Sequence, residues 1–146
     1  DLQIHRIIKE NLRKGIAGER RKHYDNILPD VTKNCSINER RAEDAEREVE
    51  KMKKTEYMLD KIGQTFDGVI SGVTAWGVYV ELPNTIEGMV HVNDMEGDYF
   101  HFNQSEYEMV GETTHKTYKL GQRVKVRCKG ADKFLRTIDF VFCEGE

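Results

Sequence analysis

Aromatic and basic side chains recur at short spacing in the second half of this 146-residue chain. Trp76 and Tyr79 lie on either side of Gly77, and Lys125 and Arg127 lie two residues apart in a later β-type run. Aromatic rings stack on the bases of single-stranded nucleic acids, and lysine and arginine neutralise phosphates. These residue types therefore indicate a surface that binds a single-stranded nucleic acid.

Each pattern also has a purely structural interpretation. Because side chains alternate along a strand, Trp76 would share the core with Val78 and Val80, and only Tyr79 would face outward. A bulge or tight bend at Gly77 would instead bring both rings to one face. Parity alone favours the core position for Trp76. The basic residues at alternate positions over 123–129 equally fit a solvated strand face.

A second aromatic group, Tyr99, Phe100 and Phe102, lies in a long connection between β-type runs, residues 93–120. It either plugs the mouth of a barrel or adds a second stacking platform. His91 precedes this connection and stands alone, as structural or merely exposed histidines commonly do.

The sequence contains no pattern that predicts catalysis or metal binding. Asp94, Glu96 and Asp98 form the nearest acidic group, and their loop setting beside Gly97 favours solvated carboxylates. The three cysteines form no CxxC pair and have no histidine at zinc-finger spacing, so we expect neither a disulfide nor a zinc framework, and we expect a reducing compartment.

Charge is segregated along the chain, although the net charge is only −3. Residues 62–112 contain no lysine or arginine, whereas 113–137 are strongly basic. The overall acidity argues against binding of duplex nucleic acid by bulk charge alone, but folding can gather the basic part on one face. No apolar run approaches the roughly 18 residues of a membrane-spanning helix, so no membrane segment is expected.

The sequence pattern of residues 62–146 is typical of a small β-barrel. Five short β-type runs, separated by glycine, asparagine and aspartate, predict a five-stranded antiparallel barrel of the OB type. We expect the strands at 65–71, 77–82, 88–92, 123–129 and 136–142.

Residues 1–61 are predicted to be helical, which makes the chain α+β. An apolar stripe marks a first helix, and a second short helix would end at Pro29, followed by a loop over 29–34. A capping box at Ser36 and Glu39 then predicts a long connecting helix over 36–60. Its narrow apolar seam fits packing on another part of a longer protein better than a coiled-coil dimer. Since Asp1 already reads as helical, we expect a piece of a longer protein.

The chain resembles the S1 RNA-binding domain over 68–80, 87–92 and 119–126. The aromatic-Gly-x-aromatic pattern of that family matches Trp76 and Tyr79, and its histidine matches His91. Its acidic and basic pair near the last turn matches Asp132 and Arg136. The resemblance implies that these five residues line an RNA surface, and it reverses the assignment of Trp76 to the core.

The similarity extends to exoribonucleases of the ribonuclease R type, in the RNB family. Residues 98–102, 110–113 and 136–140 resemble their S1 domain, 1–6 the end of their catalytic domain, and 35–43 the link between the two. The resemblance implies a cytoplasmic, monomeric parent enzyme that degrades RNA from the 3′ end with Mg²⁺ and releases nucleoside 5′-monophosphates. Its catalytic aspartates would lie upstream, so this chain has no catalytic or metal-binding residue and is expected to be inactive alone.

The predicted organisation is therefore the end of a catalytic domain plus a connecting helix over 1–61, and an S1 domain over 62–146. The expected partners are single-stranded RNA and the upstream catalytic domain in the same chain. The predicted RNA-binding residues are Trp76, Tyr79, His91, Tyr99, Phe100, Phe102, Lys125, Arg127, Asp132 and Arg136. The alternatives are a non-enzymatic RNA-binding regulator with an S1 domain and a module that binds protein partners.

Overall fold

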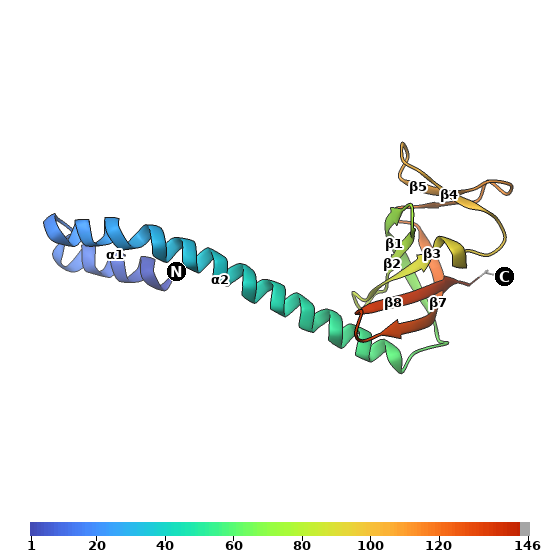
Figure 1. Ribbon diagram of the computed structural model, residues 1–146, viewed down its shortest axis with the longest axis horizontal. Coiled ribbons are helices and arrows are strands. Elements are labelled where there is room, and N and C mark those ends of the chain that lie inside the picture. The colour runs from blue at the N-terminus through green and yellow to red at the C-terminus, as the bar shows by residue number, and fades with distance from the viewer. Residues whose placement is uncertain (144–146) are drawn as a thin grey trace. The chain divides into compact units, whose positions relative to one another are not determined.

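The computed structural model describes residues 1–143 and divides the chain into two compact units, residues 1–47 and residues from 48 onward (Figure 1). The first unit is helical, and the second contains the β-structure together with the last turns of the second helix. Within the described part, no helix combines the length and apolarity needed to cross a membrane.

Five strands close a barrel in the order β1-β2-β3-β8-β7. The strands are β1 (Thr65–Thr74), β2 (Gly77–Glu81), β3 (Glu87–His91), β7 (Arg123–Asp132) and β8 (Thr137–Phe142). The predicted barrel and its strand positions are thus confirmed, with one correction. Strands β3 and β8 pair in parallel, Met89 opposite Asp139, so the sheet is mixed and not strictly antiparallel. Closure joins strands that are not consecutive in the chain, and the sequence pattern of each strand does not record that pairing.

The barrel core follows strand alternation. Val78 and Val80 of β2 are fully buried, as are Val126 of β7 and Phe140 of β8. Gly88 allows β3 to approach β8, because a Cβ atom there would lie 2.5 Å from the Phe140 ring.

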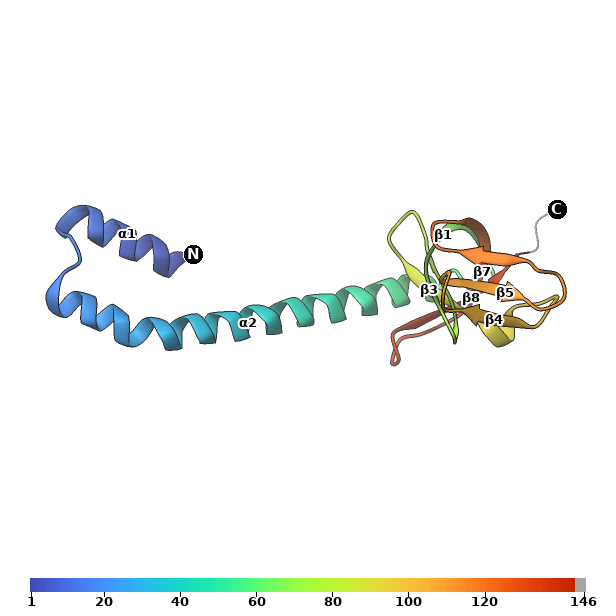
Figure 2. The same ribbon diagram turned by 90° about the horizontal axis from the view of Figure 1, so that it is seen from above.

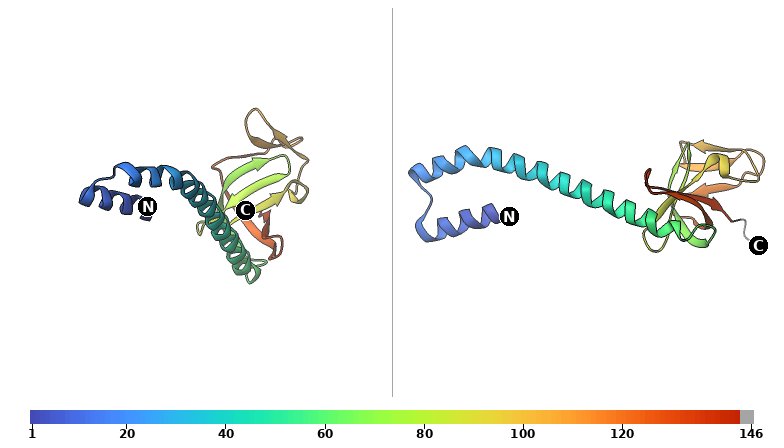
Figure 3. Two further views of the ribbon diagram at one scale, coloured as in Figure 1. Left: turned by 60° about the vertical axis from the view of Figure 1, so that its left-hand side comes forward. Right: turned by 60° about the horizontal axis from the view of Figure 1, so that its bottom comes forward.

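The final turns of α2 (Gly18–Leu59) belong to this core as well. Met58 is fully buried among the barrel side chains, and Thr55 is 1% exposed. The Thr55 hydroxyl donates to the Lys51 carbonyl at 2.9 Å, so the polar group is satisfied inside the helix. Figure 3 shows these turns next to the barrel.

The long connection forms a sheet of its own. After η1 (Val92–Asp94), the strands β4 (Phe100–Asn103), β5 (Glu108–Gly111) and β6 (Thr117–Lys119) pair antiparallel. Met109 and Tyr118 of this sheet are buried, and the Tyr118 ring stacks on Phe142 of the barrel at 4.2 Å between centroids. The connection is therefore an ordered second layer packed on the barrel.

The second helix is longer than the sequence predicted. It runs without interruption for 42 residues and contains Pro29. The predicted end at Pro29, the loop over 29–34 and the helix start at Ser36 are therefore wrong. A proline inside a helix lacks an amide donor and its ring crowds the preceding turn, but Pro29 lies on the exposed side. The Thr32 hydroxyl lies within hydrogen-bond distance of the carbonyls of Leu28 (2.8 Å) and Pro29 (3.0 Å). The helix thus continues past an exposed proline.

The helical unit is a pair of helices (Figure 2), and a cluster of polar side chains joins them. α1 (Leu2–Lys14) lies beside the first turns of α2, where the Glu10 carboxylate accepts hydrogen bonds from Arg20 Nε (2.5 Å) and from the Tyr24 hydroxyl (2.5 Å). These bonds, that from Arg20 first, lower the pKa of Glu10 to about 2. α1 contains no buried residue.

Candidate nucleic-acid interface

Trp76 occupies the tight turn between β1 and β2, and 76% of its surface is exposed. A Cβ atom at Gly77 would lie 2.2 Å from the Val90 carbonyl oxygen, so only glycine lets β2 begin this close to β3. The Val92 amide then donates to the Trp76 carbonyl at 3.0 Å. Trp76 therefore precedes β2, and the alternation of side chains along that strand does not apply to it. The parity argument for a core position is wrong.

A groove on the barrel begins next to this turn and contains three of the predicted RNA-binding residues. Tyr79, His91 and Arg136 line it, and its volume is about 740 Å³. Cross-strand pairing places Tyr79 opposite Met89, and Met89 opposite Asp139, which forms a continuous row across three strands. His91 pairs with Gly77, so the Trp76 turn adjoins one end of the groove.

The turn between β7 and β8 positions Arg136. The Asp132 carboxylate accepts hydrogen bonds from the amides of Phe134 (2.8 Å) and Leu135 (2.9 Å), so it fixes the turn itself. Arg136 has a φ of 56° and forms an ion pair with Glu48 of α2. The acidic and basic residues of the predicted pair thus have different partners in this structure.

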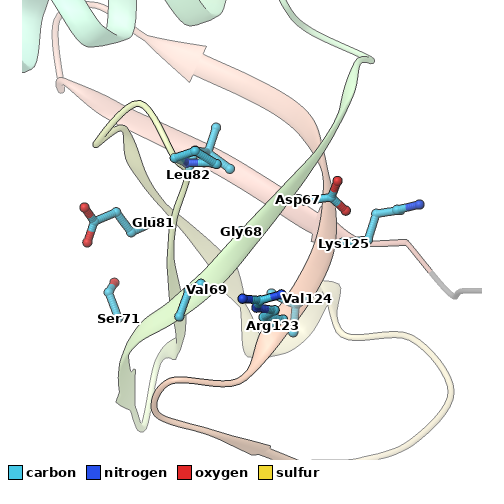
Figure 4. A pocket seen from close by; sticks show the side chains of 10 residues that line it. Asp67, Gly68, Val69, Ser71, Glu81, Leu82, Arg123, Val124 and Lys125 are labelled. Carbon is cyan, nitrogen blue, oxygen red and sulfur yellow. The ribbon is translucent and has the colours of Figure 1, made fainter.

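Lys125 and Arg127 lie on another part of the barrel. Lys125 borders a second depression of about 850 Å³, where it is paired across the strands with Asp67, as Figure 4 shows. Arg127 is exposed opposite Thr65 of β1. Glu81 is the one residue that lines both this depression and the Tyr79 groove. Lys125 therefore lies apart from the groove.

Of the three aromatic residues predicted to bind RNA in the connection, only Tyr99 presents its ring to solvent, with 84% of its surface exposed. Phe100 and Phe102 are half-buried and pack against the core, Phe100 beside Tyr118 at 5.6 Å between centroids. The structure therefore supports the barrel-plug interpretation for these two rings and leaves Tyr99 available for stacking.

Asp98 holds the loops of this small sheet. Its carboxylate accepts hydrogen bonds from the Thr114 hydroxyl (2.6 Å) and amide (2.6 Å), and from the amides of Tyr99 and Thr113. These bonds, that from the Thr114 hydroxyl first, hold the pKa of Asp98 far below its ordinary value. Asp94 pairs with Lys129 at 2.6 Å. Both carboxylates thus have protein partners.

Across residues 1–143, no three His, Cys, Asp or Glu side chains gather in a way that could hold a metal ion. The carboxylate oxygens of Asp94 and Asp98 already accept from a lysine and from amide and hydroxyl groups, so these two residues do not offer a site for Mg²⁺. No metal-dependent step is assigned to them.

Several groove residues were missed from the sequence. Lys51, Lys54 and Thr55 of α2 form one side of the groove, and Met89 contributes to its lining. Leu135 at the tip of the β7–β8 turn also lines the groove and is 73% exposed, and its neighbour Phe134, outside the groove lining, is 94% exposed. Only the last pair had a sequence signal, two adjacent apolar residues within a polar turn; the position of the lysines depends on how α2 meets the barrel.

Residues 59–141 match the family model described as S1 RNA binding domain, and the chain belongs to this family. Over its whole length it is 39% identical to Ribonuclease R 1 of Lactococcus lactis and 39% identical to Ribonuclease R of Escherichia coli, of which it covers 18% and 19%. It is 34% identical to Ribonuclease R of Thermotoga maritima, with 99% of this chain and 21% of that protein aligned. The chain thus spans about a fifth of the length of these relatives, and the predicted similarity to ribonuclease R is confirmed.

Two solved structures share the fold. The apo form of Mycoplasma genitalium RNase R superposes with a TM-score of 0.87 at 23% identity, over 98% of this chain and 23% of that one. The same enzyme in complex with ribose methylated single-stranded RNA gives a TM-score of 0.84 at 22% identity, with the same coverage.

Proposed function

We propose that the barrel binds single-stranded RNA as the RNA-binding part of a 3′–5′ exoribonuclease. The observation that carries this proposal is the exposed Trp76 ring next to a groove that contains Tyr79, His91 and Arg136. An exposed tryptophan ring leaves a large apolar surface in contact with water, which is unfavourable. A base stacked on the ring covers part of that surface. The full-length similarity to ribonuclease R proteins supports the connection to a nuclease.

In this proposal bases stack on Trp76 and Tyr79, each contributing about 1–3 kcal/mol. Arg136 exchanges its exposed ion pair with Glu48 for a phosphate, an exchange that costs little because exposed pairs are weak. His91 at the groove end donates or accepts a hydrogen bond. Stacking does not distinguish bases strongly, so binding shows little sequence preference and falls as salt rises.

The other predicted residues would then have separate roles. Tyr99 offers a further exposed ring, while Phe100 and Phe102 support the sheet that carries it. Lys125 and Arg127 would contact RNA only where the strand continues beyond the groove. Asp132 shapes the turn that presents Arg136.

The parent enzyme would hydrolyse RNA with Mg²⁺ held by residues upstream of this chain, in the cytoplasm, and release nucleoside 5′-monophosphates. The upstream catalytic domain would pack on the apolar stripe of α1, where Leu2, Ile4 and Leu12 are 67%, 60% and 80% exposed. A barrel tethered in this way raises the effective concentration of RNA at the catalytic channel.

A titration with oligo(A) tests the proposal, because Trp76 is the only tryptophan of the chain. We expect the Trp76 fluorescence to be quenched at low salt and the quenching to weaken as salt is added. In the presence of Mg²⁺ the RNA should remain full-length, since the catalytic aspartates are proposed to lie upstream of this chain. Unchanged fluorescence at low salt would contradict RNA binding and favour a protein partner, while shortened RNA would contradict the inactivity of the chain.

A further inference from the structure

The groove next to Trp76 has one wall that no sequence motif indicates, the last turns of α2. Lys51 lies four residues before Thr55, and Lys54 lies four residues before Met58. Thr55 and Met58 are the two residues of this segment that are buried against the barrel. Side chains four apart share a helix face. The face that anchors α2 in the barrel therefore also carries two lysines along the groove.

The two lysines differ in how they are held. Lys54 is 28% exposed and pairs with Glu50 at 2.8 Å, one turn earlier on the same helix. Lys51 is exposed, and within residues 1–143 no carboxylate pairs with its amine. One ammonium group is thus oriented along the groove, and the other is available to an anion.

The strands contribute acidic residues to the lining of the groove. Glu81 and Glu87 come from β2 and β3, and Asp139 comes from β8. Glu87 already accepts a hydrogen bond from the Ser71 hydroxyl at 2.6 Å. Phosphates are repelled by these carboxylates, whereas base amino groups and ribose 2′-hydroxyls can donate hydrogen bonds to them.

We propose that Lys51 and Lys54 of α2 bind the RNA backbone. The RNA then lies with its phosphates toward the helix and its bases toward Tyr79 and the acidic residues of the groove. This inference rests on the proposed RNA binding and adds the helix as a second, cationic wall. The connecting helix is then part of the RNA site as well as a link between units.

Ion pairs join α2 to the β7–β8 turn, and the pair between Glu56 and Lys133 remains when Arg136 turns to a phosphate. Glu56 pairs with Lys133 at 3.0 Å, and Glu48 pairs with Arg136. Figures 1 and 3 show the turn beside these last helical turns. The lysines lie within one helical turn of Thr55 and Met58, so the burial of these two residues and the Glu56–Lys133 pair hold the lysines beside the groove.

The test compares two double variants of equal charge. Lys51→Ala/Lys54→Ala removes the wall, and Lys33→Ala/Lys53→Ala removes two lysines of the same helix that do not line the groove. The affinity for fluorescein-labelled oligo(A) is measured by anisotropy over a range of salt concentrations. Each lost phosphate contact lowers the slope of log K against log salt by about 0.7, so the first variant should lose about 1.4 and the control nothing.

A Lys51→Arg/Lys54→Arg variant should keep the wild-type slope, and circular dichroism should show an intact helix in all variants. Equal slopes for the two alanine variants would overturn the role of the lysines. If that occurs while Trp76→Ala still weakens binding, the proposed function stands and only this inference fails. If the wild-type chain does not bind the oligonucleotide, both fail.

Discussion

The two units of the chain are stabilised in different ways. The barrel buries Phe140, Ile70 and Met58 almost completely in one core. In the helical unit, α1 exposes its apolar stripe, and Tyr24 is the one residue of positions 1–47 that the structure shows buried. A closed barrel buries its own apolar side chains, whereas an exposed apolar stripe of this kind is typical of an interaction surface.

The largest effect on stability is expected from a change in the barrel core. Phe140→Ala should lower the free energy of unfolding by about 3–5 kcal/mol, because the ring is fully buried and leaves a cavity. Urea denaturation followed by the circular dichroism of the strands measures this loss. Phe134→Ala is the matched control: this ring lies in the adjoining turn, is 94% exposed, and should change stability by less than about 0.5 kcal/mol.

A change at the exposed rings should separate binding from stability within the same unit. Trp76→Ala and Tyr79→Ala should each weaken oligo(A) binding by about 1–3 kcal/mol, which is roughly 5- to 150-fold. The urea midpoint of Trp76→Ala should stay near that of the wild type, because its ring is mostly exposed. Anisotropy of a labelled oligonucleotide measures the affinity, with Tyr57→Ala as a control outside the groove. Loss of affinity in the control as well would argue against a defined stacking site.

The smallest effect is expected when the pH is lowered, and it concerns the contact between α1 and α2. The pKa of Glu10 is lowered from 4.5 to about 2 by its bonds to Arg20 and Tyr24. A lowered pKa means that the contribution of this group is fully present above pH 4.5 and is lost as pH falls toward 2. Amide hydrogen exchange in α1, corrected for the intrinsic rate, should therefore accelerate over that interval.

Glu10→Gln should show the faster exchange already at neutral pH, whereas Glu19→Gln, an exposed residue at the start of α2, should behave as the wild type. Exchange in α1 that is independent of pH between 4.5 and 2 would mean that the polar cluster does not hold the helices together.

The barrel could be predicted from the sequence because each strand carries its own alternating pattern. Val78, Val80 and Val126 are buried where that alternation places them. Trp76 could not be placed by the same rule, since it lies in a turn that depends on the close approach of Gly77 to Val90. The family resemblance gave its exposure correctly.

Other features depended on contacts between distant residues. The parallel pairing of β3 with β8 and the helical wall of the groove join segments far apart in the chain. Pro29 misled the prediction for a local reason. It lies on the exposed side of a helix, and the hydroxyl of Thr32 lies close to the nearby carbonyls.

The parallel contact between Met89 and Asp139 has a consequence for the order of folding. It joins residues that lie 50 positions apart in sequence, and contacts of such long range form late because the entropy of closing the loop must be overcome first. Tyr79 and Met89 can pair early as a hairpin, but Arg136 and Asp139 reach the groove only when β8 docks. We therefore expect the groove that contains Tyr79 and Arg136 to be assembled in the final step of barrel closure.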